Sequence, residues 1–322
     1  MEIEQIEQAF EIILYNTQTI QKQLKTDFFD ALIEHNVGYA AYLRGEVADD
    51  LMREASTGFK ELQQLNLSAE ALRKVFQLVI IKGYQETQLQ ANHALTPDSI
   101  GFIFAYLLEN LTNQTALKVV DFGSGTGNLA QTLEFGVKSG KIKNLLGLEI
   151  DDLLIDLSAS IADLTESQLR LEQLDATRYH EGADIIISDL PIGFYPDDAI
   201  SAEFLTATNQ GKTYAHHLLI ENAMRNLRAG GFGIFLAPLT LFDSQQSDLL
   251  AKWLQKTSYL QMVINLPEKF FKGDTVQKAI YVFEKPSSDN QQREVFVYHL
   301  TDLKDRAILA SFITKFNEWY QK

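Results

Sequence analysis

The sequence contains no cysteine in its 322 residues. This absence excludes structural disulfides, metal sites built on thiolates and cysteine nucleophiles. The chain also lacks any apolar run approaching the roughly 20 residues that a membrane-spanning helix needs. Its opening residues, MEIEQIEQAF, are acidic and amphipathic, unlike a signal peptide or a basic transit peptide. We therefore expect a cytoplasmic protein that has no membrane partner.

Positive charge is also scarce, since 28 Lys and Arg residues are outnumbered by 43 Asp and Glu residues and the net charge is −15. Tight binding of nucleic acid usually depends on the neutralisation of phosphates by Lys and Arg. A role on DNA would therefore need a local basic patch or a partner protein. The remaining composition, with 46% hydrophobic and 22% charged residues, is ordinary for a globular protein.

Hydrophobic periodicity divides the chain into two parts. Near the N-terminus apolar residues such as Ile3, Ile6 and Phe10 recur at three- and four-residue steps, which predicts helices. Further along, short apolar stretches alternate with helical ones, a pattern typical of a doubly wound, mainly parallel α/β sheet. We predict an N-terminal helical domain over 1–92 and an α/β domain over 93–322. The predicted strands are 117–122, 144–150, 169–175, 183–189, 231–238, 260–267 and 278–285.

A glycine-rich turn follows the first predicted strand in the segment VVDFGSGTGNLA. Asp121 ends the strand, and Gly123, Gly125 and Gly127 permit a tight turn and a close approach of backbone to a ligand. Open α/β sheets bind ligands at the carboxyl ends of their strands. The acidic residue that ends the next strand, Glu149, can accept hydrogen bonds from a ribose diol. These features predict a cofactor site.

The spacing of the glycines bears on which cofactor binds. Asn128 stands where the dinucleotide-binding fingerprint has its last glycine. The pattern resembles the S-adenosylmethionine (SAM) turn of class I methyltransferases, although a nicotinamide-dependent oxidoreductase stays as a weaker alternative. The resemblance implies that Asp121 and the turn amides hold the amino-acid end of SAM, and that Asp175-Ala176 lies near its adenine.

The order of motifs resembles that of the N6-adenine-specific DNA methyltransferase superfamily, notably the modification subunits of type I restriction systems. The matching segments are ALTPDSIGFIFAYLL, VVDFGSGTGNLA, IIISDLPIG, LLIENAMRNLRAGGFGIFLAP and INLPEKFFKGDTVQKAIYVFEK. The chain looks like a small stand-alone bacterial member without a target-recognition domain. The resemblance implies a Rossmann-like SAM-dependent methyltransferase fold with a seven-stranded sheet. Its implied cofactor-binding residues are Thr96, Pro97, Asp121, Gly123, Ser124, Gly125, Gly127, Asn128, Glu149, Ile150, Asp175, Ala176 and Asp189.

The segment IIISDLPIGFYP resembles the family's Asn/Asp-Pro-Pro-aromatic element and carries the implied catalytic residues. An exocyclic adenine amine is a poor nucleophile because its lone pair is delocalised into the ring. Two acceptors that grip its two hydrogens favour a tetrahedral nitrogen and stabilise the charge that develops there. The resemblance assigns these acceptors to the Asp189 side chain and the Leu190 carbonyl, with Pro191 holding the turn rigid.

The sequence departs from the family pattern where the target base should stack. Leu190 replaces the first proline, and Ile192 stands in the position of the aromatic residue on which a flipped base would stack. Phe194 and Tyr195 are the candidate substrate-binding aromatics in its place. The leading hypothesis is N6-adenine-type methylation of DNA. The alternatives are a SAM-binding regulatory or scaffold protein with a decayed catalytic turn, and an N-methyltransferase that acts on RNA or protein.

Several other features have less specific interpretations. The stretch after Lys285 is too short for a target-recognition domain, so a partner protein would supply recognition or the substrate is not duplex DNA. Adjacent helical residues such as His216-His217 diverge by about 100°, which favours packing over metal binding, and no metal is expected. The polar segment 197–213 is interpreted as a mobile lid or substrate loop. A solvated face is expected for Lys269, Lys272 and Lys278, although they could touch phosphates near the site.

Overall fold

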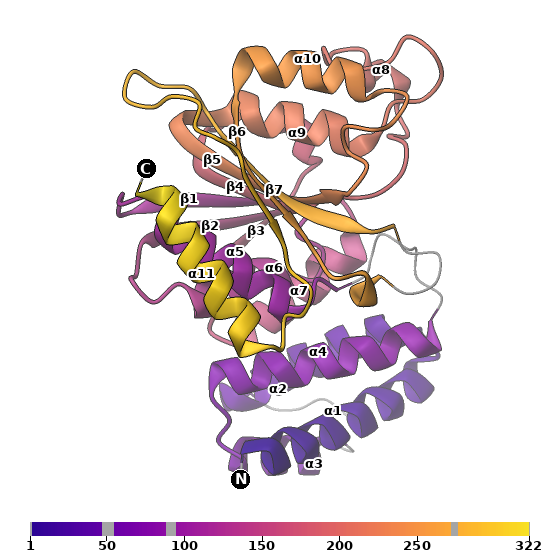
Figure 1. The fold of residues 1–322 in the computed structure, drawn as a ribbon. Helices are drawn as coiled ribbons and strands as arrows, with labels where there is room; N and C mark the ends of the chain where they lie inside the picture. Colours follow the sequence, from indigo (N-terminus) through magenta and orange to yellow (C-terminus); the bar gives the residue numbers. More distant parts are fainter. Residues whose placement is uncertain (1, 47–54, 88–94, 272–275, 322) are drawn as a thin grey trace.

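The structure, a computed structural model, describes residues 2–46, 55–87, 95–271 and 276–321 (Figure 1). Its N-terminal part is helical, as the periodicity predicts. Side chains cap two of these helices: the Asp27 carboxylate accepts from the amides of Phe29 and Asp30, and the Ser68 hydroxyl accepts from the Ala71 amide. Among the described residues, the N-terminal helices are α1 (Glu2–Leu24), α2 (Phe28–Leu43), α3 (Ser56–Gln64) and α4 (Ala69–Glu86).

The N-terminal helices bury one hydrophobic cluster among themselves, in which Ile13, Phe28 and Phe76 are fully enclosed. Leu157 and Ile161, from a helix of the following α/β part, belong to the same cluster. The helical part is thus packed on the sheet-containing part, as Figure 1 shows below the sheet. The predicted domain boundary at 92/93 lies outside the described residues.

Over the part of the chain that the structure describes, the sheet has eight strands in the order β3-β2-β1-β4-β5-β7-β6-β8. Strand β7 runs antiparallel to both of its neighbours, and the other pairs are parallel. The doubly wound, mainly parallel α/β sheet is therefore confirmed, with one strand more than predicted. The strands are β1 (Leu117–Phe122), β2 (Ile142–Glu149), β3 (Leu169–Gln173), β4 (Ala183–Asp189), β5 (Leu227–Pro238), β6 (Tyr259–Asn265), β7 (Lys278–Glu284) and β8 (Phe296–His299).

Helices cover both faces of the sheet, so β4 is buried on both sides. Ile185 and Ile187 pack into the cluster formed with α5, α6 and α11, whereas Ile186 packs into the cluster formed with α9 and α10. This alternation follows from the two-residue period of a strand and explains the continuous isoleucine run. The remaining helices are α5 (Asp98–Leu111), α6 (Asn128–Gly136), α7 (Asp152–Leu164), α8 (Asp198–Ser201), α9 (Ala215–Asn226), α10 (Ser247–Thr257) and α11 (Arg306–Tyr320), with short 3₁₀ turns η3 (Ala176–Arg178) and η4 (Glu268–Phe270).

The connection between α9 and β5 differs from the prediction. The sequence predicts a helix from about Tyr214 to Leu227 with Gly230-Gly231 as its C-cap, but the helix ends at Asn226 and β5 begins at the next residue. Gly230 has a φ of 76°, and the β4–β5 register shifts beside it. A Cβ on Gly231 would lie 2.6 Å from the Asp184 carbonyl oxygen. The glycines therefore form an irregularity within the strand and allow close backbone approach.

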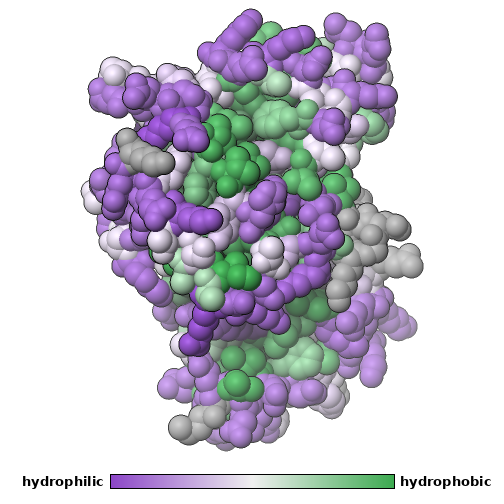
Figure 2. Space-filling model, in the orientation of Figure 1, coloured by the Kyte–Doolittle hydropathy of each residue, from purple (hydrophilic) through white to green (hydrophobic). Residues whose placement is uncertain are grey.

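Hydrophilic side chains cover most of the visible face, with hydrophobic side chains showing between them around the middle of the molecule (Figure 2). Over the residues that the structure describes, no helix combines the length and the apolarity needed to cross a membrane.

Candidate active site

A cavity of about 670 Å³ opens at the carboxyl edge of the parallel strands. Its wall is built from segments that follow β1, β2, β3 and β4, together with the start of α9. Because parallel strands deliver their carboxyl ends to one edge, residues far apart in the sequence meet here. The predicted site residues in its lining are Gly123, Gly125, Glu149, Ile150, Asp175, Ala176, Asp189, Pro191, Phe194 and Tyr195.

The glycine turn has the backbone conformation that the motif predicts. Gly123 and Gly125 have φ angles of 68° and 55°, a region that other residues rarely adopt, and the space beyond their Cα atoms is open. The Glu149 carboxylate fastens the turn to the end of β2. One of its oxygens accepts from the Gly125 amide at 2.7 Å, and the other accepts from the amides of Ile150 and Asp151 at 2.9 and 3.0 Å.

Asp121 is 1% exposed, and its carboxyl oxygens have no hydrogen-bond partner within the described part of the chain. Burial raises the pKa of Asp121 well above its ordinary value, and the nearby carboxylates of Asp189 and Glu149 raise it further. A buried, unpaired carboxyl group two residues before the turn is an uncommon arrangement. It marks Asp121 as a group that a bound cation would stabilise in its charged form.

Asp189 ends β4 at the cavity, and both of its oxygens are engaged. The Thr96 hydroxyl donates to Oδ2 at 2.7 Å, and the Lys278 ammonium forms an ion pair with Oδ1. Lys278 Nζ also donates to the Leu190 carbonyl at 3.2 Å. The side chains of Lys278 and Asp189 are 16% and 21% exposed. One ammonium group thus contacts both of the acceptors that the family resemblance assigns to the substrate amine.

The prediction of a solvated face is wrong for Lys278, because its side chain is largely buried and contacts Asp189 and the Leu190 carbonyl. Lys269 instead forms an ion pair with Asp302 near the surface. Lys272 lies outside the described residues.

The two candidate substrate aromatics both line the cavity but differ in exposure. Tyr195 is buried, and its hydroxyl donates to the Asp175 carboxylate and lies 3.3 Å from the Thr177 hydroxyl. Burial and the bond to Asp175 raise the pKa of Tyr195 to about 12. Phe194 is 55% exposed at the cavity, so of the two it alone presents a large free ring surface.

Phe194 is the outer member of a stack of rings. Its ring lies 4.9 Å from that of Tyr214 at an interplanar angle of 11°, and Tyr214 lies 5.2 Å from His216 at 21°. Two backbone hydrogen bonds fix the stack: Tyr195 N donates to Thr213 O at 2.8 Å, and Ala215 N donates to Gly193 O at 3.0 Å. A planar group on Phe194 would therefore rest on a rigid support.

The polar segment 197–213 begins and ends beside this stack, where Tyr195 N donates to Thr213 O. The buried Glu221 carboxylate accepts from the amides of Leu205 at 3.0 Å and Thr206 at 2.7 Å, which ties the segment to α9. Its movement as a lid stays a prediction. His216 and His217 are both buried, and burial lowers their pKa values to about 4 and about 3, so both are neutral at pH 7. Across the described ranges, no cluster of His, Asp and Glu side chains is arranged to hold a metal ion.

Other predicted site residues are not part of the cavity lining. Leu190 is fully buried, and its amide donates to the Leu236 carbonyl at 2.9 Å. Ile192 is half-buried. Gly127 has a φ of 75° and caps the start of α6. The lining does not include these three or Thr96, Pro97, Asp121, Ser124 and Asn128.

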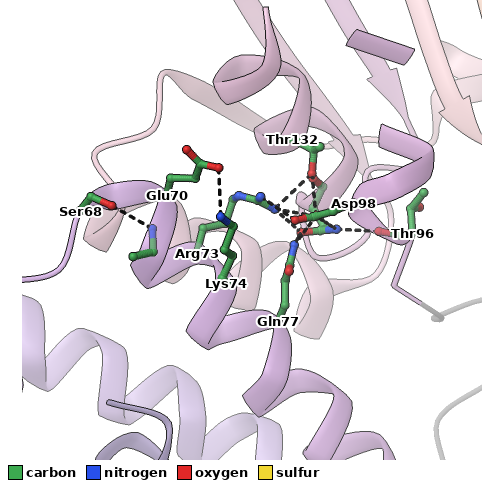
Figure 3. Close-up of polar contacts among 10 residues, drawn as sticks. Ser68, Glu70, Arg73, Lys74, Gln77, Thr96, Asp98 and Thr132 are labelled. Atoms are coloured by element: carbon green, nitrogen blue, oxygen red, sulfur yellow. Dashed lines mark hydrogen bonds and ion pairs between the residues drawn. The ribbon is translucent and has the colours of Figure 1, made fainter. Parts of the chain in front are cut away.

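A buried arginine that the sequence did not single out connects the N-terminal helices to this site (Figure 3). Arg73 of α4 is 2% exposed and binds both Asp98 oxygens, at 2.9 and 2.8 Å. It also donates to Asn128 Oδ1 and Thr132 Oγ1, each at 3.1 Å. Asn128 in turn donates to the Thr96 carbonyl at 2.6 Å. A continuous polar network therefore runs from α4 through the start of α6 to Thr96, the residue that donates to Asp189.

The sheet order with antiparallel β7 and the glycine turn at its carboxyl edge define the Rossmann-like fold of SAM-dependent methyltransferases. A model of the N-6 DNA methylase family matches residues 69–320. The chain belongs to this family.

Individual relatives agree with this assignment over nearly the whole chain. The uncharacterized protein YtxK of Bacillus subtilis (strain 168) is 29% identical over 333 residues, covering 100% of this chain and 99% of that protein. A crystal structure from Listeria monocytogenes, described as a candidate class I SAM-dependent methyltransferase, is 30% identical with a TM-score of 0.89, covering 98% of this chain and 99% of that one.

A more distant neighbour shares the fold alone. The methyltransferase subunit of a type I restriction-modification system from Streptococcus thermophilus is 10% identical, with a TM-score of 0.64, covering 97% of this chain and 93% of that chain.

Proposed function

We propose that this protein is a SAM-dependent methyltransferase that methylates an exocyclic amine, with adenine N6 in DNA as the substrate. The observation that carries the proposal is the position of Asp189, which ends β4 in the wall of the glycine-lined cavity, with the Leu190 carbonyl directly after it. Lys278 Nζ contacts both of these oxygens, which supports their assignment as joint acceptors from a single nitrogen.

The residues present fit SAM. Glycine-lined space, the acidic Glu149 and the unpaired Asp121 carboxyl group suit a cofactor that bears a ribose and a positively charged amino-acid end. When bound, SAM supplies an electrophilic methyl group carried on a sulfonium. We assign the amino-acid end to Asp121 and the amides of the turn, and the adenine end to Asp175-Ala176. Glu149 already accepts three backbone hydrogen bonds of the about four that a carboxylate can take, which leaves room for a ribose hydroxyl.

Asp189 and Leu190 would act on the substrate amine. Two acceptors on its two hydrogens draw the nitrogen lone pair out of conjugation, and the Asp189 carboxylate stabilises the positive charge that grows on the nitrogen. Thr96 holds the second Asp189 oxygen at 2.7 Å, so the carboxylate is fixed in orientation before a substrate arrives. Pro191 restricts the backbone that carries the Leu190 carbonyl.

Phe194 would serve as the stacking platform that the position of Ile192 does not provide. Its exposed ring, backed by Tyr214 and His216, lies in the cavity wall that also contains Asp189. Stacking on an aromatic side chain is how enzymes that act on a flipped base hold it. Tyr195 would act indirectly, by orienting Asp175 through its hydroxyl group.

A partner protein would supply recognition of the DNA sequence. The net charge of −15 opposes unaided binding to phosphates. We assign the binding of such a partner to the helical domain proposed over 1–92, because none of its described residues lines the cavity, and the catalytic role to the domain proposed over 93–322.

The test uses labelled SAM and three acceptor pools: unmethylated DNA, RNA and protein. With the recognition partner present, the DNA pool should take up the methyl group. Asp189→Ala should abolish transfer while SAM binding, measured by calorimetry, is retained. Uptake by RNA or protein alone would replace the substrate assignment, and full activity of Asp189→Ala would refute the proposed role of its carboxylate.

Cofactor binding is tested separately. Gly125→Trp should abolish SAM binding, because a large side chain would fill the cavity. Gly140→Trp is the matched control, since Gly140 also has a positive φ, 65°, with open space beyond it, but is not in the cavity wall. Thermal stabilisation by NAD and not by SAM or S-adenosylhomocysteine would exclude the methyltransferase.

One observation favours a second candidate function, a SAM-binding regulatory or scaffold protein. Ile192 is half-buried at the position where the family places its stacking aromatic. Tight SAM binding with no labelled product from any pool would support this candidate, and gain of transfer in Ile192→Tyr would identify the missing ring as the cause.

A further inference from the structure

Lys278 has a contact set that the proposed reaction does not use. Its Nζ forms an ion pair with Asp189 Oδ1 and donates to the Leu190 carbonyl at 3.2 Å. These are the two acceptors assigned above to the substrate amine. Because Thr96 donates to the other Asp189 oxygen, Oδ1 is the oxygen that Lys278 and a substrate would share.

The Lys278 ammonium and a substrate amine cannot occupy the position beside Asp189 Oδ1 and the Leu190 carbonyl at the same time. Both are nitrogens that donate to the same pair of oxygens, so their positions overlap. The charge of the ammonium also opposes the positive charge that a nitrogen gains as it is methylated. We propose that Lys278 is a built-in competitor for the amine site, which a substrate amine enters only when the Lys278 side chain withdraws. This inference rests on the proposed function.

The surroundings allow such a withdrawal without a change of fold. Lys278 is the first residue of β7, where its backbone pairs with Pro238 of β5, while its side chain is a flexible four-carbon stem. His216 lies close enough for the charge of Lys278 to affect it, and burial together with that charge lowers the pKa of His216 to about 4. The imidazole is therefore neutral at pH 7 and adds no opposing charge that would expel Lys278.

The first experiment measures the position of Lys278 without any methyl transfer. The full-length protein is treated with an amine-acylating reagent, and the labelling rate of each lysine is followed by peptide mass spectrometry. Lys278 should react at least about tenfold more slowly than the exposed Lys252 and Lys256, because a charge-assisted contact must open first. Asp189→Asn should speed the labelling of Lys278 and leave the two reference lysines unchanged. Equal rates for all three lysines in the wild type would overturn the proposal.

The second experiment measures competition. Lys278→Met removes the ammonium but keeps the length of the side chain, and Lys256→Met is the control on the exposed surface of α10. With unmethylated DNA and labelled SAM, Lys278→Met should lower KM for DNA by about tenfold without reducing kcat, because one competing charge-assisted contact is removed. Lys278→Arg, which keeps the charge, should not lower KM. Addition of S-adenosylhomocysteine and unmethylated DNA should also speed the acylation of Lys278 in the wild type.

The remaining outcomes separate this proposal from the proposed function. Loss of transfer in a folded Lys278→Met that still binds SAM would show that Lys278 is required for the reaction, and would overturn its role as a competitor. Absence of transfer in every variant with the recognition partner present would refute the proposed function and, with it, the competition. Slow labelling of Lys278 would then report only its ion pair with Asp189.

Discussion

Arg73 and Lys74 are adjacent on α4 but differ sharply in environment, which makes them a matched pair of substitutions (Figure 3). Arg73 is 2% exposed and forms a two-pronged ion pair with Asp98, whose side chain is 21% exposed. Lys74 forms an exposed pair with Glu70 at 3.2 Å one helical turn away, with side chains 40% and 39% exposed. The same replacement, Arg73→Met or Lys74→Met, therefore removes a buried charge in one case and an exposed one in the other.

The expected costs follow from burial. Removing one partner of a buried ion pair costs about 3–5 kcal/mol because the other charge is left uncompensated. Asp98 keeps donors from Gln77 and Thr132, so the lower end, about 3 kcal/mol, applies to Arg73→Met. An exposed pair one helical turn apart is worth about 0.3–0.5 kcal/mol after screening by solvent, which is the cost expected for Lys74→Met.

Urea unfolding followed by circular dichroism measures both costs. A double-mutant cycle with Asp98→Asn isolates the coupling between Arg73 and Asp98. Equal destabilisation by Arg73→Met and Lys74→Met, or a coupling free energy near zero, would refute the claim that this ion pair joins the N-terminal helices to the cofactor side of the sheet.

The ion pair also has a pH signature. Burial raises the pKa of Asp98, but hydrogen bonds and charge from Arg73, with further bonds from Gln77 and Thr132, outweigh it, so the folded-state pKa lies below 3.8. A lowered carboxyl pKa contributes stability above the unfolded pKa, and that stability is lost as the pH falls through the folded value. The difference between wild type and Arg73→Met should therefore be full above about pH 4 and shrink at lower pH.

Three further predictions concern other parts of the molecule. Burial lowers the pKa values of His35, His216 and His217 to about 4, 4 and 3. Below pH 6.5 these three histidines therefore bind more protons in the unfolded chain than in the folded chain. Stability should fall as the pH drops from 6.5 towards 4, and His217→Leu should reduce that slope by about 1.4 kcal/mol per pH unit in urea titrations at several pH values; an unchanged slope would contradict the assignment. Phe194→Ala should weaken DNA binding by about 1–3 kcal/mol and leave SAM affinity unchanged. Phe102→Ala, on the exposed side of α5, should change neither affinity in fluorescence-anisotropy titrations. Gly231→Ala should destabilise the fold by about 1–3 kcal/mol, since its Cβ would meet the Asp184 carbonyl oxygen at 2.6 Å, and a cost near zero in urea unfolding would mean that the β4–β5 pairing can relax.

The strands of the sheet and the place of the cavity could be predicted because they depend on local patterns. The isoleucine run of β4 indicates a strand buried on both faces, and Asp189 follows at the edge where ligands bind. The spacing of Gly123 and Gly125 likewise predicts the positive φ angles of the turn. β8 was missed because it spans only Phe296–His299 and pairs with β6 alone at the edge of the sheet.

The contacts of charged side chains could not be predicted in the same way. Lys278 reaches an aspartate 89 positions earlier in the chain, and only the order of strands in the folded sheet brings β7 close to the end of β4. Arg73 sits in an ordinary helical pattern, and nothing near it indicates that its partner is Asp98. The local sequence around Gly230 and Gly231 predicts a helix cap, but both glycines lie in β5, where Gly231 packs closely against the Asp184 carbonyl of β4.

The most direct measurement is the transfer of labelled methyl from SAM to unmethylated DNA, followed by separation of the nucleosides. Wild-type protein, together with its recognition partner if one is required, should yield N6-methyladenosine in its deoxy form. Asp189→Ala should yield none while binding SAM as tightly as the wild type. Labelled product at undiminished rate from Asp189→Ala, or tight SAM binding by the wild type with no labelled adenine under any condition, would contradict amine methylation at Asp189.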